Sequence, residues 1–192
     1  MLKGITRSGL ALSLALVFSM AGLATAARAQ QGTQQKPTYT LAEYNAYQAA
    51  AKETNPQQRV KLLDDFVSKF PKSTLLPYVY QSYYQTYNQL KQYDKVIEYA
   101  DKLAESTAEA ATNGMKLQAI YQREVAFNMS FNDKAPDAAQ QAQKARQFAQ
   151  TGQKLLGELA KPAAMSDAQF AAQKKGPAAL FSYTEGFTSL FL

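Results

Sequence analysis

The side chains that most often carry out chemistry are scarce in this sequence. Its 192 residues include neither cysteine nor histidine. A disulfide, a thiolate nucleophile, a Cys/His zinc site and catalysis by an imidazole base are therefore excluded. The sequence also lacks the G-x-S-x-G, S-x-x-K and phosphate-loop patterns. We predict a protein that is not an enzyme and that takes no cofactor.

Two groups of acidic and amide side chains are close enough in the sequence to suggest a metal site. Asn132, Asp133 and Asp137 form the first group, but they lack the glycine and the final glutamate of an EF-hand loop. Capping of the following helix explains them better. The second group has the spacing of ion pairs along one helix face and consists of Glu98, Asp101 and Glu105 with Lys95 and Lys102. We therefore predict no metal site.

The elements that position the remaining polar residues are predicted to be helices. Thr40 and Glu43 form a T-x-x-E capping box that opens a helix to about residue 52. Asn55 and Pro56 supply a cap and a first-turn proline for a second helix, which ends at Pro71. This pattern returns after 36 residues, since Tyr44, Tyr47, Val60 and Val67 are followed by Tyr80, Tyr83, Val96 and Leu103. A repeat of this period predicts stacked helix pairs.

The repeat predicts helices at 75–89 and 93–105, and the later periodicity predicts further helices. A helix is expected over 115–129, and a long helix follows the capping segment 133–137 and ends before Pro162. Ser166 and Gln169 form another capping box, which opens a short helix to residue 175. Gly176-Pro177 is expected to break the chain before a last apolar helix at 178–192.

The second unit resembles a tetratricopeptide repeat. Tyr80-x2-Tyr83-Tyr84-x2-Tyr87 follows the spacing of the first helix of that family, and residues 90–100 resemble its second helix. The segment Tyr183-x2-Gly186-Phe187-x2-Leu190 resembles another first helix. The resemblance implies an all-α fold of stacked antiparallel helix pairs, an α-solenoid of about three to four degenerate units over residues 40–192. Tyr84 departs from the pattern, because the family prefers a small residue there.

The resemblance also implies a binding site, because the first helices of this family line a concave groove. The groove positions carry over mainly to amide side chains, which donate and accept hydrogen bonds and can hold the main chain of a peptide. We expect a non-catalytic scaffold that binds a protein or peptide partner there. The candidate residues are Asn45, Tyr78, Gln81, Gln85, Asn88, Gln89 and Arg123. A solvated polar face is the plain alternative.

Two other functions stay open at this stage. The tyrosines at 80, 83, 84 and 87 match packing positions and are expected in the core, but they could instead line a pocket for a small solute. An enzyme would need carboxylates, lysines or tyrosines that converge in a cleft with shifted pKa values.

The N-terminus predicts export. Residues 1–29 combine a basic start, an apolar stretch at 10–23 and the small-residue end Ala27-Arg28-Ala29, as in a cleaved signal peptide. Ala24-Thr25-Ala26 is the alternative cleavage site, and a retained membrane anchor is the alternative to cleavage. Residues 30–39 form a polar linker. We expect a periplasmic or secreted soluble protein with no membrane span after cleavage and, without cysteine, no lipid anchor of the lipoprotein type.

The charge of the mature chain does not favour nucleic acid as a partner. Three of the 21 basic residues lie in the first 29, which leaves 18 against 15 acidic residues. No basic stripe of the kind that binds nucleic acid is present. The apolar helix at 178–192 has no partner helix after it in the sequence. It predicts either a piece of a longer array or self-association through that helix.

Overall fold

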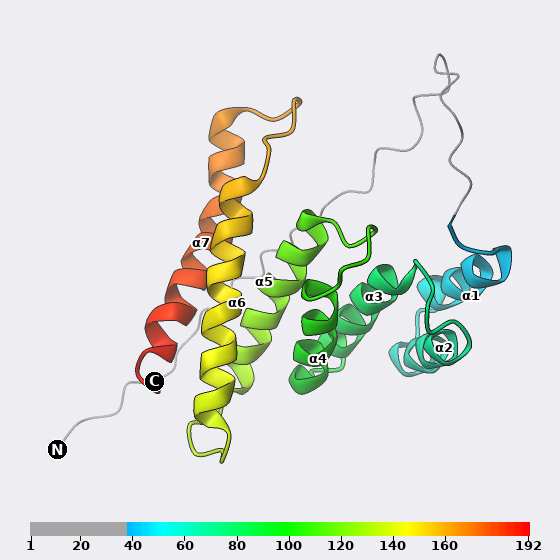
Figure 1. The fold of residues 1–192 in the computed structure, drawn as a ribbon, viewed down its shortest axis with the longest axis horizontal. Coiled ribbons are helices and arrows are strands. Elements are labelled where there is room, and N and C mark those ends of the chain that lie inside the picture. Colours follow the sequence, from blue (N-terminus) through cyan, green and yellow to red (C-terminus); the bar gives the residue numbers. More distant parts are fainter. Residues whose placement is uncertain (1–37) are drawn as a thin grey trace. The chain divides into compact units, whose positions relative to one another are not determined.

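The computed structural model describes residues 38–192, so the predicted signal peptide and residues 30–37 of the predicted linker lie outside the described part. Within that part the chain forms seven helices and no strand, which confirms the all-α class (Figure 1). The helices are α1 (Leu41–Lys52), α2 (Pro56–Lys69), α3 (Leu76–Gln89), α4 (Tyr93–Ala104), α5 (Asn113–Ser130), α6 (Ala138–Glu158) and α7 (Asp167–Thr188).

Local capping chemistry sets the start of several helices. At α1, the Thr40 hydroxyl accepts from the backbone N–H of Glu43, and the Glu43 carboxylate accepts from the backbone N–H of Thr40. Asn55 caps α2 ahead of Pro56, and Ser166 with Gln169 forms a second capping box at α7. These bonds satisfy N–H groups that have no partner within the helix. The predicted helix starts at these positions are confirmed.

The last helix differs from the prediction. We expected a break at Gly176-Pro177, but α7 is continuous from Asp167 to Thr188 with Pro177 inside it. A proline in a helix removes one backbone hydrogen bond and crowds the preceding turn. Packing offsets this cost, because α7 runs beside α6 (Figure 1) and buries Phe181 completely. A local signal was therefore overridden by tertiary contacts.

Each helix packs against the next one along the chain, and α5 also contacts α3 and α7. The larger group of core residues spans α1 to α5 and is centred on side chains such as Leu63, Phe66, Val79, Tyr83 and Leu103. A smaller group joins α5, α6 and α7 through Leu117, Ile120, Phe148, Leu156 and Phe181. Helix α7 therefore buries one side within its own chain. None of the described helices has the length and apolar character needed to span a membrane.

The end of the predicted linker is part of the helical domain. The Tyr39 ring stacks on Tyr44 with centroids 5.9 Å apart, and the hydroxyls of Thr38 and Thr74 lie 3.1 Å apart. Thr38 and Thr74 are themselves 36 residues apart in the sequence, so the repeat extends to this pair. Thr38 and Tyr39, at the end of the predicted linker, therefore contact the helical domain.

A candidate binding surface and an interior charged cluster

The predicted amide residues of α3 lie on one side of the helix. Gln81, Gln85 and Asn88 follow one another at spacings of four and three residues, which places them on a common helix face. Gln85 and Asn88 are exposed and Gln81 is half-buried. The core tyrosines Tyr83, Tyr84 and Tyr87 are buried. The exposed side of the helix therefore carries the amide residues.

A hydrogen bond joins this face to α5. The Gln81 side-chain amide donates to the Gln118 side-chain oxygen over 3.4 Å. Gln122 follows Gln118 by one helical turn and is also half-buried. The two helices therefore place their amides side by side, and we call this set the amide face: Gln81, Gln85, Asn88, Gln118 and Gln122.

The other predicted surface residues are Asn45, Tyr78 and Gln89. Asn45 is exposed on α1 and Gln89 is exposed at the end of α3. Tyr78 is 38% exposed at the start of α3, and its ring lies 6.3 Å from that of Tyr47 on α1. Among the described residues, no hydrogen bond connects Asn45 or Gln89 to the amide face. The sequence located these residues correctly on the surface, but it missed Gln118 and Gln122.

Arg123 is not on the binding surface, and our prediction is corrected at this position. Its side chain is 2% exposed, and it lies in the interior between α4, α5 and α6. The guanidinium Nε donates to Asp101 over 3.0 Å, and Nη1 donates to Glu124 over 3.0 Å. It also lies 4.9 Å from the centre of the Phe148 ring. Arg123 therefore binds within its own chain.

Arg123 is the centre of a charged cluster that links three helices. Asp101 on α4 also accepts from Lys144 on α6 over 2.8 Å, so this carboxylate bridges two cations. Lys144 lies 3.6 Å from Glu105 as well. The hydrogen bond from Lys144 to Asp101 raises the pKa of Lys144 above its ordinary value. Because the pairs compensate one another, Arg123 and Asp101 are buried without isolated charges, while Lys144 and Glu105 reach the surface.

Glu124 is the least compensated member of this cluster. Its side chain is fully buried, and only Oε1 has a hydrogen-bond partner. Burial raises the pKa of Glu124 to about 7, against the lowering effect of the neighbouring Arg123 charge. A carboxyl group with this environment is a common feature of functional sites, although structural networks produce it too. In the sequence, the adjacent charges of Arg123-Glu124 within an otherwise apolar segment were the feature that could have predicted this buried cluster.

The tyrosines that could have lined a solute pocket are packed against one another. The rings of Tyr83 and Tyr99 stack with centroids 3.9 Å apart, and Tyr87 stacks on both. The Tyr83 hydroxyl donates to Asp64 on α2 over 2.6 Å. Burial raises the pKa values of Tyr83, Tyr84 and Tyr99 above the ordinary range of a phenol. This arrangement is a core contact between α2, α3 and α4.

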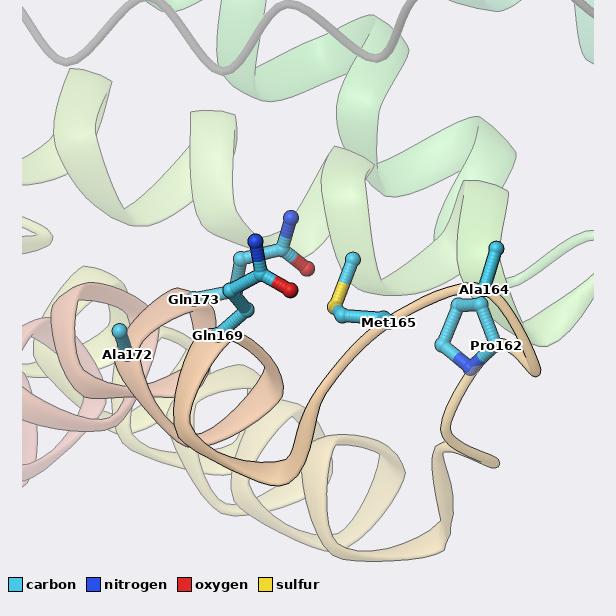
Figure 2. Close-up of a pocket in the computed structure, with 6 residues that line it drawn as sticks. All are labelled: Pro162, Ala164, Met165, Gln169, Ala172 and Gln173. Atoms are coloured by element: carbon cyan, nitrogen blue, oxygen red, sulfur yellow. The ribbon is translucent and has the colours of Figure 1, made fainter.

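Two hollows on the described surface lie away from these tyrosines. One open hollow lies where the α6–α7 loop meets the first turns of α7, and Figure 2 shows Met165, Gln169 and Gln173 projecting into it. A second lies on the outer side of α6, beside Leu192. Neither is lined by the tyrosines, so the geometry gives no support to a tyrosine-lined solute site.

The predicted acidic groups take structural roles in the described part of the chain. Glu98 bonds both Lys95 and Lys102, over 2.8 and 2.7 Å. Asp137 accepts from the Gln141 side chain, and Asn132 accepts from the backbone of Lys134. Within residues 38–192, no three acidic side chains come together in a way that would hold a metal ion.

Comparisons with protein-family models, with curated protein sequences and with solved structures gave no significant match.

Proposed function

We propose that this chain is a non-catalytic scaffold that binds an extended peptide segment of a partner protein on the amide face. The hydrogen bond between Gln81 and Gln118 carries the proposal, because it brings amides from two helices into one surface. Each amide offers a donor and an acceptor, which are the groups that an extended main chain presents. The face could thus hold a segment through its backbone.

The order of helix contacts supports a tetratricopeptide-like stack. Consecutive helices pack together, and the first helices of successive pairs touch one another, α3 with α5 and α5 with α7. In such a stack the first helices form one continuous surface. A surface held by packed helices is preorganised, so a partner would bind without ordering it first.

We also propose that the protein acts outside the cytoplasm, in the periplasm or as a secreted protein. The support is the signal-peptide pattern of residues 1–29, with its small-residue end before Gln30. Sequencing the N-terminus of the protein recovered from an envelope or medium fraction tests this directly. A first residue of Gln30 is expected, and an intact Met1 would contradict the cleavage.

The binding proposal is tested with selected peptides. A library of displayed random peptides is selected on the chain, and the dissociation constants of enriched peptides are measured by fluorescence anisotropy. The test variant is Gln81→Ala/Gln85→Ala/Gln122→Ala. The matched control carries the same three changes on the outer side of α6, at the exposed residues Gln140, Gln143 and Gln147.

We expect the amide-face variant to bind at least about tenfold more weakly, since each lost hydrogen bond is worth about 1 kcal/mol. The α6 control should bind as the wild type does. Because the amide face carries no charge, affinity should change little between low and high salt. Equal binding by both variants, or a failure of the library to yield any binder, would contradict the proposal.

A further inference from the structure

Two buried oxygen atoms on α5 have no hydrogen-bond donor. They are Oε2 of Glu124 and Oδ1 of Asn128. The two residues are one helical turn apart and so lie on the same side of α5. A buried acceptor without a donor is costly, because it has given up its bonds to water. Both acceptors lie on the side of α5 that meets Thr184 of α7.

The orientation of the Asn128 amide is fixed by its neighbours. Its nitrogen donates to the backbone oxygen of Glu124 over 2.8 Å and to the Thr184 hydroxyl on α7 over 2.9 Å. A backbone oxygen can only accept, so the amide nitrogen must face it and Oδ1 cannot turn to take its place. The bond to Thr184 also makes Asn128 a direct link between α5 and α7.

Charged groups from several elements surround Glu124. On α5, the Arg123 guanidinium donates to Oε1 of Glu124. On α6, Asp101 raises the pKa of Lys144, so this lysine is charged near neutral pH. The acidic neighbours are Asp101 on α4 and Glu105 directly after α4, both paired with Lys144. On α7 the residue that faces the site is the uncharged Thr184, followed in the chain by Glu185.

Glu124 is then the group whose charge changes near neutrality. Its Oε1 already accepts from Arg123, which leaves Oε2 as the oxygen that takes a proton. Burial raises its pKa from the ordinary 4.5 to about 7. The unpaired oxygens and the pKa agree on which group holds the proton.

We propose that Glu124, Asn128 and Thr184 form a proton-dependent contact that holds α7 against α5. A proton on Oε2 of Glu124 turns that oxygen into a donor, and the new O–H can serve the unpaired Oδ1 of Asn128. Without the proton, Oδ1 of Asn128 stays unpaired and a negative charge lies in the interior next to α7, offset only in part by Arg123 and the Thr184 hydroxyl, which lower the pKa of Glu124. Loss of the proton loosens α7, whose last turn packs on α5 through the contact of Phe187 with Phe127.

The direction of the effect follows from the direction of the pKa change. A carboxyl group whose pKa is raised on folding stabilises the fold at low pH, and this stabilisation is lost as the pH rises through the folded value. The window runs from about pH 4.5 to about pH 7. Between about pH 5.5 and about pH 8.5, the equilibrium constant for the opening of α7 should increase roughly 30-fold, provided that Glu124 is exposed to water in the open form.

Hydrogen exchange of α7 amides, read by mass spectrometry on the full chain, measures this opening after correction for the intrinsic pH dependence of exchange. The wild type should lose about 30-fold in α7 protection over that pH range. Glu124→Gln carries a permanent donor in place of the proton, so its α7 protection should be high at both pH values. Glu109→Gln, at an exposed position, is the control and should behave as the wild type.

A wild type whose α7 protection does not change with pH would overturn the proposal, as would a Glu124→Gln variant that keeps the wild-type change. A second measurement needs no variant and so does not depend on how well Glu124→Gln folds. Infrared difference spectra should show the carbonyl stretch of a buried protonated carboxyl, which disappears with a midpoint near pH 7. If that carboxyl ionises at the ordinary value of a glutamate, the proposal is wrong.

Discussion

The ring of Phe181 on α7 lies directly against the backbone of α6 at Gly152. A Cβ atom at residue 152 would lie 2.7 Å from Cζ of Phe181, closer than two carbon atoms can approach without a shift. Both residues are buried. Glycine is therefore required at this crossing of α6 and α7, where it permits the close approach of the aromatic ring.

Gly152→Ala should destabilise the protein, although alanine is the better helix former. The helix propensity favours alanine by about 1 kcal/mol, but the displaced ring costs about 1–3 kcal/mol. We expect a net loss of up to about 2 kcal/mol in the free energy of unfolding, measured with urea.

The control for this prediction lies on the same helix. A Cβ atom at Gly157 would meet no other atom within 4 Å, so Gly157→Ala should gain about 0.5–1 kcal/mol. A Gly152→Ala variant as stable as Gly157→Ala would show that α6 and α7 do not meet in this way.

Two adjacent tyrosines should respond in opposite directions to the loss of their hydroxyls. The Tyr83 hydroxyl donates to the Asp64 carboxylate over 2.6 Å, whereas the Tyr84 hydroxyl is buried without a partner. Tyr83→Phe should lower the free energy of unfolding by about 1–2 kcal/mol, because it removes a hydrogen bond to a charged group. Tyr84→Phe should be neutral or stabilising, because it removes an unsatisfied polar group.

Each of these variants is the control for the other, since both remove one oxygen from the same helix. Urea unfolding of the two proteins under one condition gives the comparison. Equal losses in the free energy of unfolding would mean that the Tyr84 hydroxyl has a hydrogen-bond partner or that the bond from Tyr83 to Asp64 does not stabilise the fold.

The parts of this fold that the sequence predicted are set by neighbours in the chain. Thr40 caps with Glu43, Asn55 precedes Pro56, and Ser166 caps with Gln169, all within three residues. Capping and helical periodicity act over such distances, so a single sequence displays them. The amide residues of α3 were predicted on the surface for the same reason.

The missed features depend on residues that are far apart in the sequence. Arg123 pairs with Asp101, 22 residues away, and Asn128 bonds Thr184, 56 residues away. The local sequence around an arginine does not show whether its side chain is buried, because the residues that pack on it come from distant parts of the chain. Pro177 wrongly predicted a break, because contacts between α6 and α7 keep the helix continuous.

Removing the arginine at the centre of the charged cluster should be strongly destabilising. Arg123→Met leaves the buried Glu124 and Asp101 without their shared partner, which typically costs about 3–5 kcal/mol. The loss should be smaller at about pH 5 than at about pH 8, because Glu124, with its pKa raised to about 7, is neutral at the lower pH.

A surface pair provides the comparison for Arg123. Lys102→Met removes an exposed partner of Glu98 and should cost less than about 1 kcal/mol at either pH. The measurement is urea unfolding of both variants at the two pH values. A loss in Arg123→Met as small as that in Lys102→Met would mean that Arg123 is hydrated and not buried.

The continuity of α7 can be tested at its internal proline. In a continuous helix, Pro177→Ala restores a backbone donor and removes the clash with the preceding turn, so stability should rise by about 1–3 kcal/mol. Pro56 occupies the first turn of α2, where proline is well tolerated, and Pro56→Ala should change stability by less than about 1 kcal/mol. If the chain instead broke at Gly176-Pro177, as its local sequence predicts, Pro177→Ala would resemble Pro56→Ala. The difference between the two free energies of unfolding therefore distinguishes one long helix, held in place by α6, from two short ones.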